Sequence, residues 1–270
     1  MEAACDTSTR GPRSEPVLRS FAEGVLIGRS SGTATPDVLA LHGWARTHRD
    51  FDGVLAPVPA GPDGPADPEL DAIALDLPGF GAAPAPSEPW GTADYARAVA
   101  PVLGEVATPV VVLGHSFGGR VALQLAAGWP GQVRALVLTG VPLPPPGSGR
   151  RPPLGFRMAR LLHRRGLVSD ERMEAARQRH GSADYRTAEG VMRQVLVRTL
   201  QERYEEQLSA IGCPVELVWG DDDADAPLSM ARAAAGHLAR STLTVCPGAG
   251  HLTPLTVPGA LHRAVRSALR

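Results

Sequence analysis

The sequence predicts an α/β protein with a doubly wound, mostly parallel sheet and an all-helical insertion in the second half of the chain. Short apolar runs rich in β-branched residues alternate with helical patterns, which is typical of parallel strands covered on both faces by helices. This alternation stops between residues 142 and 209, where only helical patterns occur. With 270 residues and 43% apolar content, the chain can bury one sizeable core.

Six apolar runs are expected to form the strands of this sheet. They are Val38–Leu41, Ala72–Leu75, Val110–Leu113, Ala135–Leu138, Val215–Trp219 and Leu243–Val245. Helical spacing of apolar residues predicts helices over 95–106, 117–128 and 259–270, and Pro101 should kink or shorten the first of them. The stretch 58–71 is rich in Pro, Gly and Asp, which indicates a surface loop.

The chain divides into three parts by composition. Residues 1–16 are polar and are expected to form a disordered tail. Residues 17–141 and 210–270 form the α/β core, and residues 142–209 form a helical cap, or lid. The cap begins with the Pro- and Gly-rich stretch 142–149 and continues with helical patterns near 154–165, 169–180 and 184–208.

Charge and composition narrow the classes of partner. A formal charge of −1 gives no reason to expect nucleic acid or an anionic membrane surface as a partner. No apolar run reaches the ~20 residues of a transmembrane helix, and the N-terminus has no signal-peptide pattern. Three widely spaced cysteines favour reduced thiols. We therefore expect a cytoplasmic monomer or homodimer that uses no cofactor or metal.

The strongest chemical motif is Gly114-His-Ser-Phe-Gly118. It follows the apolar run 110–113 and opens the helical run 117–128, which is the strand–turn–helix context of a nucleophile elbow. Glycines are needed because neighbouring side chains do not fit in so tight a turn. Ser116 would project above the sheet at a helix N-terminus, where developing negative charge is favoured. Ser116 is therefore the candidate nucleophile.

A serine hydroxyl needs a base, and His251 has the context for one. It follows the last expected strand and precedes the last expected helix. His42 and His115 flank the expected site, where we expect each to hold an adjoining backbone element in place. The other histidines are expected at the surface: His48, His163, His180, His237 and His262.

A carboxylate should orient the histidine ring and stabilise its protonated form. Four aspartates follow the strand 215–219, namely Asp221, Asp222, Asp223 and Asp225. For the oxyanion, one backbone amide is expected from Phe117, directly after the nucleophile, and the other from Trp44 in the loop His42-Gly-Trp44. The side chains expected to contact substrate are those of Trp44, His42, Phe117 and Leu252.

Four motifs occur in sequence: Leu41-His-Gly-Trp44, Asp76-Leu-Pro-Gly-Phe-Gly81, Gly114-His-Ser-Phe-Gly-Gly119 and Gly250-His251. Together they resemble the α/β-hydrolase superfamily, and in particular the capped serine esterases typified by pimeloyl-ester carboxylesterases. The resemblance covers residues 38 to 258. It implies the triad order serine, acid, histidine and places the lid after the sixth strand. It also implies a G-x-x-D pattern followed by proline for the acid, which selects Asp223, with Asp225 as the main rival.

Departures from related groups favour hydrolysis of a carboxylic ester or thioester of a small to medium substrate. Ser116 replaces the aspartate nucleophile of dehalogenases and epoxide hydrolases. Carbon–carbon hydrolases usually carry an Asn that this chain lacks, although the triad itself does not exclude that reaction. Acyl transfer or cyclisation by the same residues, and a ligand receptor built on a hydrolase scaffold, also remain open.

The cap is strongly basic, with 13 arginines, 8 acidic residues and a net charge of +5. The plain interpretation is that these arginines lie on solvated helix faces and pair with the acidic core across the interface between lid and core. A sharper hypothesis is that Arg157, Arg160 and Arg164, which share one helix face by their spacing, attract an acidic substrate.

Overall fold

The computed structural model of the chain describes residues 18–60, 66–143, 158, 161–163, 165–169, 171–173 and 183–270. Its centre is an eight-stranded sheet with the order β1-β2-β4-β3-β5-β6-β7-β8. The strands are β1 (Leu18–Phe21), β2 (Leu26–Ser31), β3 (Val38–Leu41), β4 (Ala72–Asp76), β5 (Val110–His115), β6 (Val133–Thr139), β7 (Val215–Gly220) and β8 (Ser241–Cys246). The pairs β1–β2 and β2–β4 are antiparallel and the others are parallel, which confirms the predicted mostly parallel sheet.

The six predicted strands all fall within β3 to β8, but the two N-terminal strands were not predicted. The reason lies in their exposure. Three of the four residues of β1 are exposed, and β2 begins with alternating buried and half-buried residues before it ends in Ser30 and Ser31. Neither strand is buried on both faces, so neither shows the continuous apolar run that marks the central strands.

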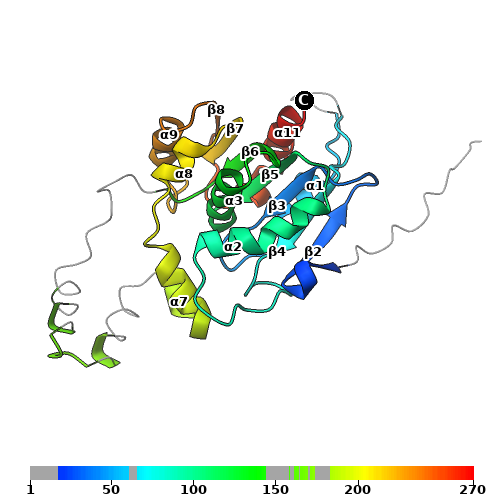
Figure 1. The fold of residues 1–270 in the computed structure, drawn as a ribbon. Helices are drawn as coiled ribbons and strands as arrows, with labels where there is room; N and C mark the ends of the chain where they lie inside the picture. The colour runs from blue at the N-terminus through cyan, green and yellow to red at the C-terminus, as the bar shows by residue number, and fades with distance from the viewer. Residues whose placement is uncertain are drawn as a thin grey trace, which may run out of the picture.

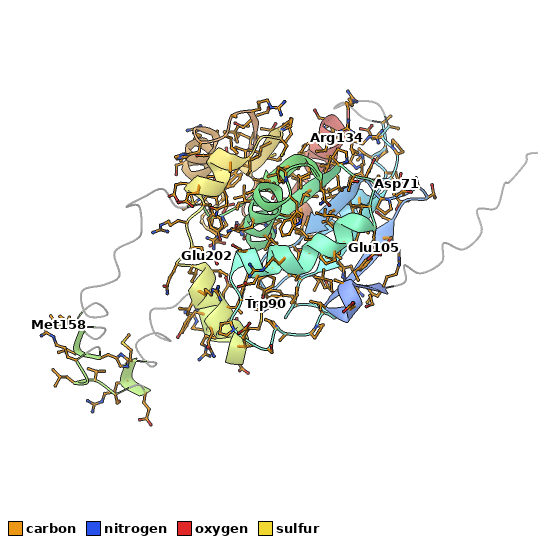
Figure 2. The ribbon with its side chains drawn as sticks, viewed as in Figure 1. Asp71, Trp90, Glu105, Arg134, Met158 and Glu202 are labelled. Atoms are coloured by element: carbon orange, nitrogen blue, oxygen red, sulfur yellow. The ribbon has the colours of Figure 1, made fainter. Side chains whose placement is uncertain are left out.

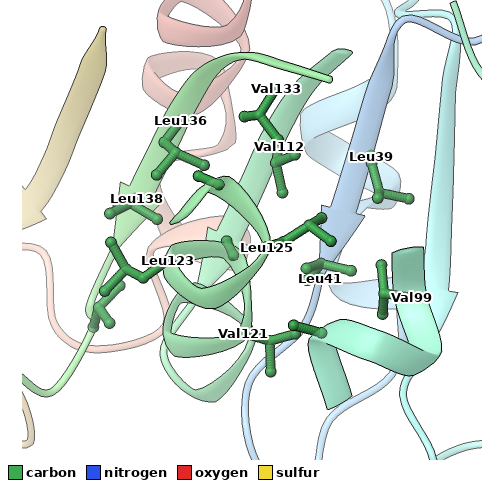
Figure 3. Close-up of a cluster of buried hydrophobic side chains, with 14 of the residues drawn as sticks. Leu39, Leu41, Val99, Val112, Val121, Leu123, Leu125, Val133, Leu136 and Leu138 are labelled. Carbon is green, nitrogen blue, oxygen red and sulfur yellow. The ribbon is translucent and has the colours of Figure 1, made fainter. Parts of the chain in front are cut away.

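Helices cover both faces of the sheet, as Figure 1 shows. On one face, α1 (Asp52–Leu55), α10 (Thr253–Thr256) and α11 (Pro258–Ala268) pack together. On the other lie α2 (Thr92–Val99), α3 (Phe117–Gly128), α8 (Glu205–Ala210) and α9 (Leu228–Ala235). Figure 3 shows α3 packed on the sheet, where Val121 and Leu125 belong to the same buried cluster as the strand residues Leu41 and Val112. The predicted helix 117–128 is therefore confirmed.

Pro101 has the predicted effect on its helix. The α-helix α2 ends at Val99, and a tighter 3-10 turn continues over Ala100–Gly104 with the proline in its first turn. Pro101 has no N–H to donate in an α-helical ladder, so the chain changes conformation where the proline enters.

Charged side chains such as Glu105 and Arg134 lie on the outside of the molecule (Figure 2).

The helical insertion leaves the core after β6 and returns before β7, where it was predicted. Its described helices are α6 (Ala183–Thr187), α7 (Gly190–Thr199) and the core-packed α8. The predicted helix 184–208 is thus three helices, and Gly190 has a φ of +51° where α7 begins. The predicted helices 154–165 and 169–180 lie mostly outside the described residues, and the predicted tail 1–16 lies outside them entirely.

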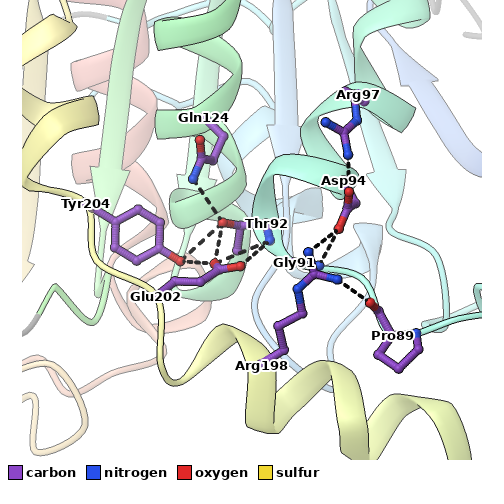
Figure 4. Close-up of polar contacts among 9 residues, drawn as sticks. All are labelled: Pro89, Gly91, Thr92, Asp94, Arg97, Gln124, Arg198, Glu202 and Tyr204. Atoms are coloured by element: carbon purple, nitrogen blue, oxygen red, sulfur yellow. Dashed lines mark hydrogen bonds and ion pairs between the residues drawn. The ribbon is translucent and has the colours of Figure 1, made fainter.

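Polar contacts attach the returning end of the insertion to α2 (Figure 4). The Glu202 carboxylate accepts hydrogen bonds from the Thr92 hydroxyl at 2.6 Å, the Thr92 amide at 3.0 Å and the Tyr204 hydroxyl at 2.7 Å. Arg198 donates to the Pro89 carbonyl at 2.6 Å and pairs with Asp94 at 3.2 Å. These bonds fix where α7 lies above the sheet.

In the described part of the chain, no helix is long and apolar enough to cross a membrane.

Candidate active site

A cavity of about 540 Å³ lies where the carboxyl ends of the parallel strands meet the insertion. Loops after β3, β5, β7 and β8 contribute Trp44, Ser116, Asp225 and His251 to its lining, and α7 contributes Leu196 among others. In open parallel sheets, ligands bind outside the carboxyl ends of the strands. The candidate residues of four separate motifs therefore converge on one cavity.

Ser116 sits in a strained turn between β5 and α3. Its φ is +50° and its ψ −113°, a region that residues with a side chain rarely adopt. Glycines make the turn possible. A Cβ on Gly114 would lie 2.6 Å from the Gly119 Cα, and a Cβ on Gly118 would lie 2.1 Å from the Leu41 carbonyl oxygen. The sharp turn directs the serine side chain into the cavity at the start of α3.

An unbroken hydrogen-bonded chain connects Ser116, His251 and Asp223. The Ser116 Oγ lies 3.0 Å from His251 Nε2, and His251 Nδ1 lies 2.9 Å from Asp223 Oδ2. Asp223 is 3% exposed, and its Oδ1 accepts hydrogen bonds from the amides of Asp225 and Ala226. These two hydrogen bonds hold the carboxylate in place, and the carboxylate in turn orients the histidine ring. The three residues are those predicted for nucleophile, base and acid.

The charges around His251 raise its pKa above the ordinary value of 6.5. Burial acts in the opposite direction and is the largest single effect, because it disfavours the charged ring. The hydrogen bond to Asp223 and the negative charges of Asp223, Asp225 and Asp184 together outweigh it. The site therefore stabilises the protonated ring that a general base becomes when it accepts a proton.

The other loop aspartates have different positions. Asp225 lies two residues after Asp223, and its exposed side chain lines the cavity, while its amide supports the Asp223 carboxylate. Asp221 accepts a hydrogen bond from the Gly248 amide at 2.7 Å. Asp221 and Asp222 are both exposed. In this structure only Asp223 among the four has a hydrogen bond to His251.

Phe117 and Trp44, the two residues predicted to supply the oxyanion amides, line the cavity together with Ser116. Phe117 is the first residue of α3, a position whose amide has no acceptor within the helix. Among the described residues, neither its amide nor that of Trp44 donates to a backbone carbonyl. The Trp44 ring packs edge-on against Phe117 and Phe80, with ring centroids 5.5 and 4.9 Å away. Trp44 therefore both lines the cavity and packs against neighbouring aromatic side chains.

His42 does not have the predicted position against substrate. Its side chain is fully buried and does not line the described wall of the cavity. The Leu77 amide donates to Nε2 at 3.0 Å, so Nδ1 carries the proton and donates to the Gly43 carbonyl at 2.7 Å. Burial lowers its pKa to about 4. His42 instead holds the loop that carries the Trp44 amide, which is the structural position also expected for it.

His115 supports the opposite side of the site. Its Nε2 donates to the His251 carbonyl at 3.0 Å and so ties the elbow to the loop of the base. Burial, followed by the charge of His251, lowers its pKa to about 4, and the ring is neutral near neutral pH. Leu252, the remaining residue predicted to contact substrate, is 38% exposed and lines the cavity beside His251.

The prediction that the remaining histidines lie at the surface is wrong for two of them. His48 is 7% exposed, and both its amide and its Nδ1 bond to Asp76 Oδ1, at 2.8 and 2.9 Å. His262 is fully buried, and its Nδ1 donates to the Val54 carbonyl at 2.8 Å, which joins α11 to α1. Their partners come from distant parts of the chain, so local sequence gave no signal of burial. His237 is exposed and His163 is half-buried, while His180 lies outside the described residues.

Three charged cavity residues were not predicted: Arg46, Arg120 and Asp184. Arg46 forms a two-pronged ion pair with Asp50, at 2.7 and 2.6 Å. Arg120 lies four residues after Ser116, a spacing that places both on one face of a helix and could have drawn attention to it. The cap arginines proposed to attract substrate, Arg157, Arg160 and Arg164, lie outside the described residues.

The comparison with known families agrees with this geometry. A model of the alpha/beta hydrolase family matches residues 38–264. The chain belongs to the alpha/beta hydrolase family. This family match covers the elbow, the acid loop and the histidine loop, so it includes each of the residues that converge on the cavity.

Individual relatives extend the comparison. A pimeloyl-[acyl-carrier protein] methyl ester esterase of Neisseria meningitidis serogroup C is 38% identical over 111 residues, which span 41% of this chain and 39% of that protein. A protein of the same name from Aromatoleum aromaticum is 28% identical over 83% of this chain and 94% of its own length. The solved structure of a thermophilic esterase from Thermogutta terrifontis has a TM-score of 0.66 at 24% identity, covering 95% of this chain and 98% of that one. This structural likeness shows the shared fold.

Proposed function

We propose that this alpha/beta hydrolase is a serine esterase that cleaves a carboxylic ester or thioester through an acyl-enzyme on Ser116. The observation that carries the proposal is the hydrogen-bonded chain from Ser116 through His251 to Asp223, open at one end to the cavity. Relatives named as methyl ester esterases support this reaction class. A cavity of about 540 Å³ suits a small to medium substrate.

In the first half of the proposed reaction, His251 removes the Ser116 proton as Oγ attacks the substrate carbonyl carbon. Negative charge moves to the carbonyl oxygen, where the Phe117 and Trp44 amides stabilise it. The protonated ring then gives its proton to the leaving alcohol or thiol, which completes the acyl-enzyme. Asp223 holds the ring in the tautomer that presents a free Nε2 to the serine.

In the second half, His251 removes a proton from water, which attacks the acyl carbon and forms a second oxyanion in the same place. Collapse releases the acid and returns the proton to Ser116. Acyl transfer, cyclisation and carbon–carbon cleavage use the same residues with another acceptor or leaving group, and we propose hydrolysis because the named relatives are esterases. A ligand receptor on this scaffold would bind esters tightly without turnover.

The test is the Ser116→Ala variant, assayed against a series of activated esters of increasing acyl length. The variant should lose activity on the order of a million-fold, because the base is left without a nucleophile. A serine-directed phosphonate should label Ser116 in the unaltered protein. Ser267→Ala, at an exposed position on α11, is the control and should retain full turnover. Normal activity in Ser116→Ala, or a label on another serine, would contradict the proposal.

A further inference from the structure

Arg120 occupies an unusual position for a charged side chain. It lies on α3 one helical turn beyond Ser116, is 7% exposed and lines the cavity. Its Nε and Nη2 donate to the Pro142 carbonyl at 2.9 and 2.6 Å, and its Nη1 donates to the Thr199 carbonyl at 3.3 Å. Its guanidinium therefore lies where the insertion leaves the core and where α7 ends.

The positive charge of Arg120 has no direct counter-charge. No carboxylate lies within ion-pair distance of it among the described residues. Tyr204 and then Glu202 are the groups that favour its charge; the guanidinium carbon lies 5.6 Å from the centre of the Tyr204 ring, and the Glu202 carboxylate is hydrogen-bonded to Thr92 and Tyr204. Buried charges are normally paired. A guanidinium has five N–H groups, so one on each terminal nitrogen is left without an acceptor in this part of the protein.

The cavity lining also includes negative charges that act on His251, the proposed base. These charges are those of Asp184 and Asp225. The leaving alcohol must lie on the side of the base, because His251 has to reach the leaving oxygen with its proton. The acyl group then extends away from these acids. Of the two arginines that line the cavity in the described residues, Arg46 is already paired with Asp50, which leaves Arg120 as the positive charge available to the acyl group.

We propose that Arg120 is a specificity-determining residue that binds a carboxylate on the acyl group, so that the favoured substrates are esters of acids with a second carboxylate. The inference rests on the proposed esterase function. A carboxylate would accept the two remaining N–H groups and supply the missing counter-charge, and arginine suits this geometry because of its planar fork. Asp184 and Asp225, whose charges act on His251, would repel the same carboxylate, so attraction by Arg120 and repulsion by the aspartates together would orient the substrate.

The experiment compares methyl half-esters of straight-chain dicarboxylic acids with the matching terminal carboxamides, which have the same shape but no charge. The unaltered protein should give the higher kcat/KM on the carboxylate of a pair. Arg120→Gln should lower this preference about tenfold to hundredfold, the range of one charge-assisted hydrogen bond. Arg120→Lys, which keeps the charge and loses the fork, should retain part of it.

Arg198→Gln is the matched control, because Arg198 also attaches α7 to the core but does not line the cavity. It should leave the ratio between the two esters unchanged. If Arg120 only anchors the insertion, Arg120→Gln will slow both esters equally, and that result overturns the proposal. Equal kcat/KM values for the two esters in the unaltered protein overturn it as well, even if Arg120→Gln does not fold. If neither ester is hydrolysed while activated esters are, the proposal for the acyl group fails; if activated esters are not hydrolysed either, the esterase function itself is contradicted.

Discussion

Asp223 and Asp225 are identical side chains two positions apart, and their surroundings give them different tasks. Asp223 is buried, receives two backbone amides and contacts His251 Nδ1. Asp225 is exposed and acts on His251 only through its charge. The hydrogen bond of Asp223 sets the orientation of the ring, whereas the charge of Asp225 affects only how easily the ring is protonated.

Replacing each aspartate with asparagine should separate these two effects. Asp223→Asn should reduce kcat by about ten-thousandfold, because the amide favours the wrong tautomer of the ring. Asp225→Asn should keep most of the activity and lower the pKa of His251 toward 6.5, since one negative charge is lost. Only the neutral ring acts as a base, so the acidic limb of the kcat/KM profile should move to lower pH. A severe loss of kcat in Asp225→Asn would instead give Asp225 the role of the acid.

The nucleophile and base could be predicted from local sequence, but other site residues could not. Ser116 and His251 each follow a strand at a recognisable turn. Asp223 could be chosen among four neighbouring aspartates only through a family resemblance, because burial of its carboxylate depends on distant chain segments. The burial of Arg120 depends on Pro142 and Thr199, which tertiary folding brings to it. Local sequence shows such a residue only as an arginine on a helix.

The elbow between β5 and α3 depends on glycines whose neighbours are backbone atoms. Gly118 donates its amide to the His42 carbonyl at 2.9 Å, and a Cβ there would lie 2.1 Å from the Leu41 oxygen and 2.5 Å from that of His42. Backbone cannot move aside as a flexible side chain can. Gly128 lies at the other end of the same helix, where an added Cβ has nothing within 4 Å.

We therefore expect opposite outcomes from two glycine-to-alanine changes in α3. Gly118→Ala should destabilise the fold by several kcal/mol, about the upper range for overpacking, because β3 and α3 must separate. Gly128→Ala should leave stability equal or raise it by up to about 1 kcal/mol through better helix propensity. Urea unfolding of the two variants measures both. Equal stability of Gly118→Ala and the unaltered protein would show that the elbow tolerates a wider turn.

The central strands and the helix α3 could be predicted as elements because they are buried, and buried strands and helices have continuous or periodic apolar residues in the sequence. β3 to β7 are buried over most of their length, and each contains a predicted run. The edge strand β1, its neighbour β2 and the break at Gly190 lack such a signal. Their conformation follows from pairing and packing with the rest of the sheet, which sequence periodicity does not record.

At the scale of the whole molecule, two neutral histidines join the loops that form the site. His42, in the loop after β3, accepts a hydrogen bond from the Leu77 amide. His115, in the elbow, donates one to the His251 carbonyl. Burial lowers both pKa values to about 4. In the unfolded chain the same rings would titrate near 6.5. Both therefore link the stability of the fold to pH.

Between about pH 7.5 and 5 the unfolded chain binds more protons at these two rings than the folded protein, so stability should fall as the pH falls. Each ring should remove about 2 kcal/mol from the free energy of unfolding over that interval. The raised pKa of His251 acts in the opposite direction, because the folded protein binds that proton more tightly. Urea unfolding at the two pH values measures the net change.

His115→Gln keeps an N–H donor for the His251 carbonyl but does not titrate, so its free energy of unfolding should fall by about 2 kcal/mol less on acidification. His237→Gln, at an exposed position, should leave the pH dependence as it is. An unchanged pH dependence in His115→Gln would mean that His115 keeps its ordinary pKa in the folded protein.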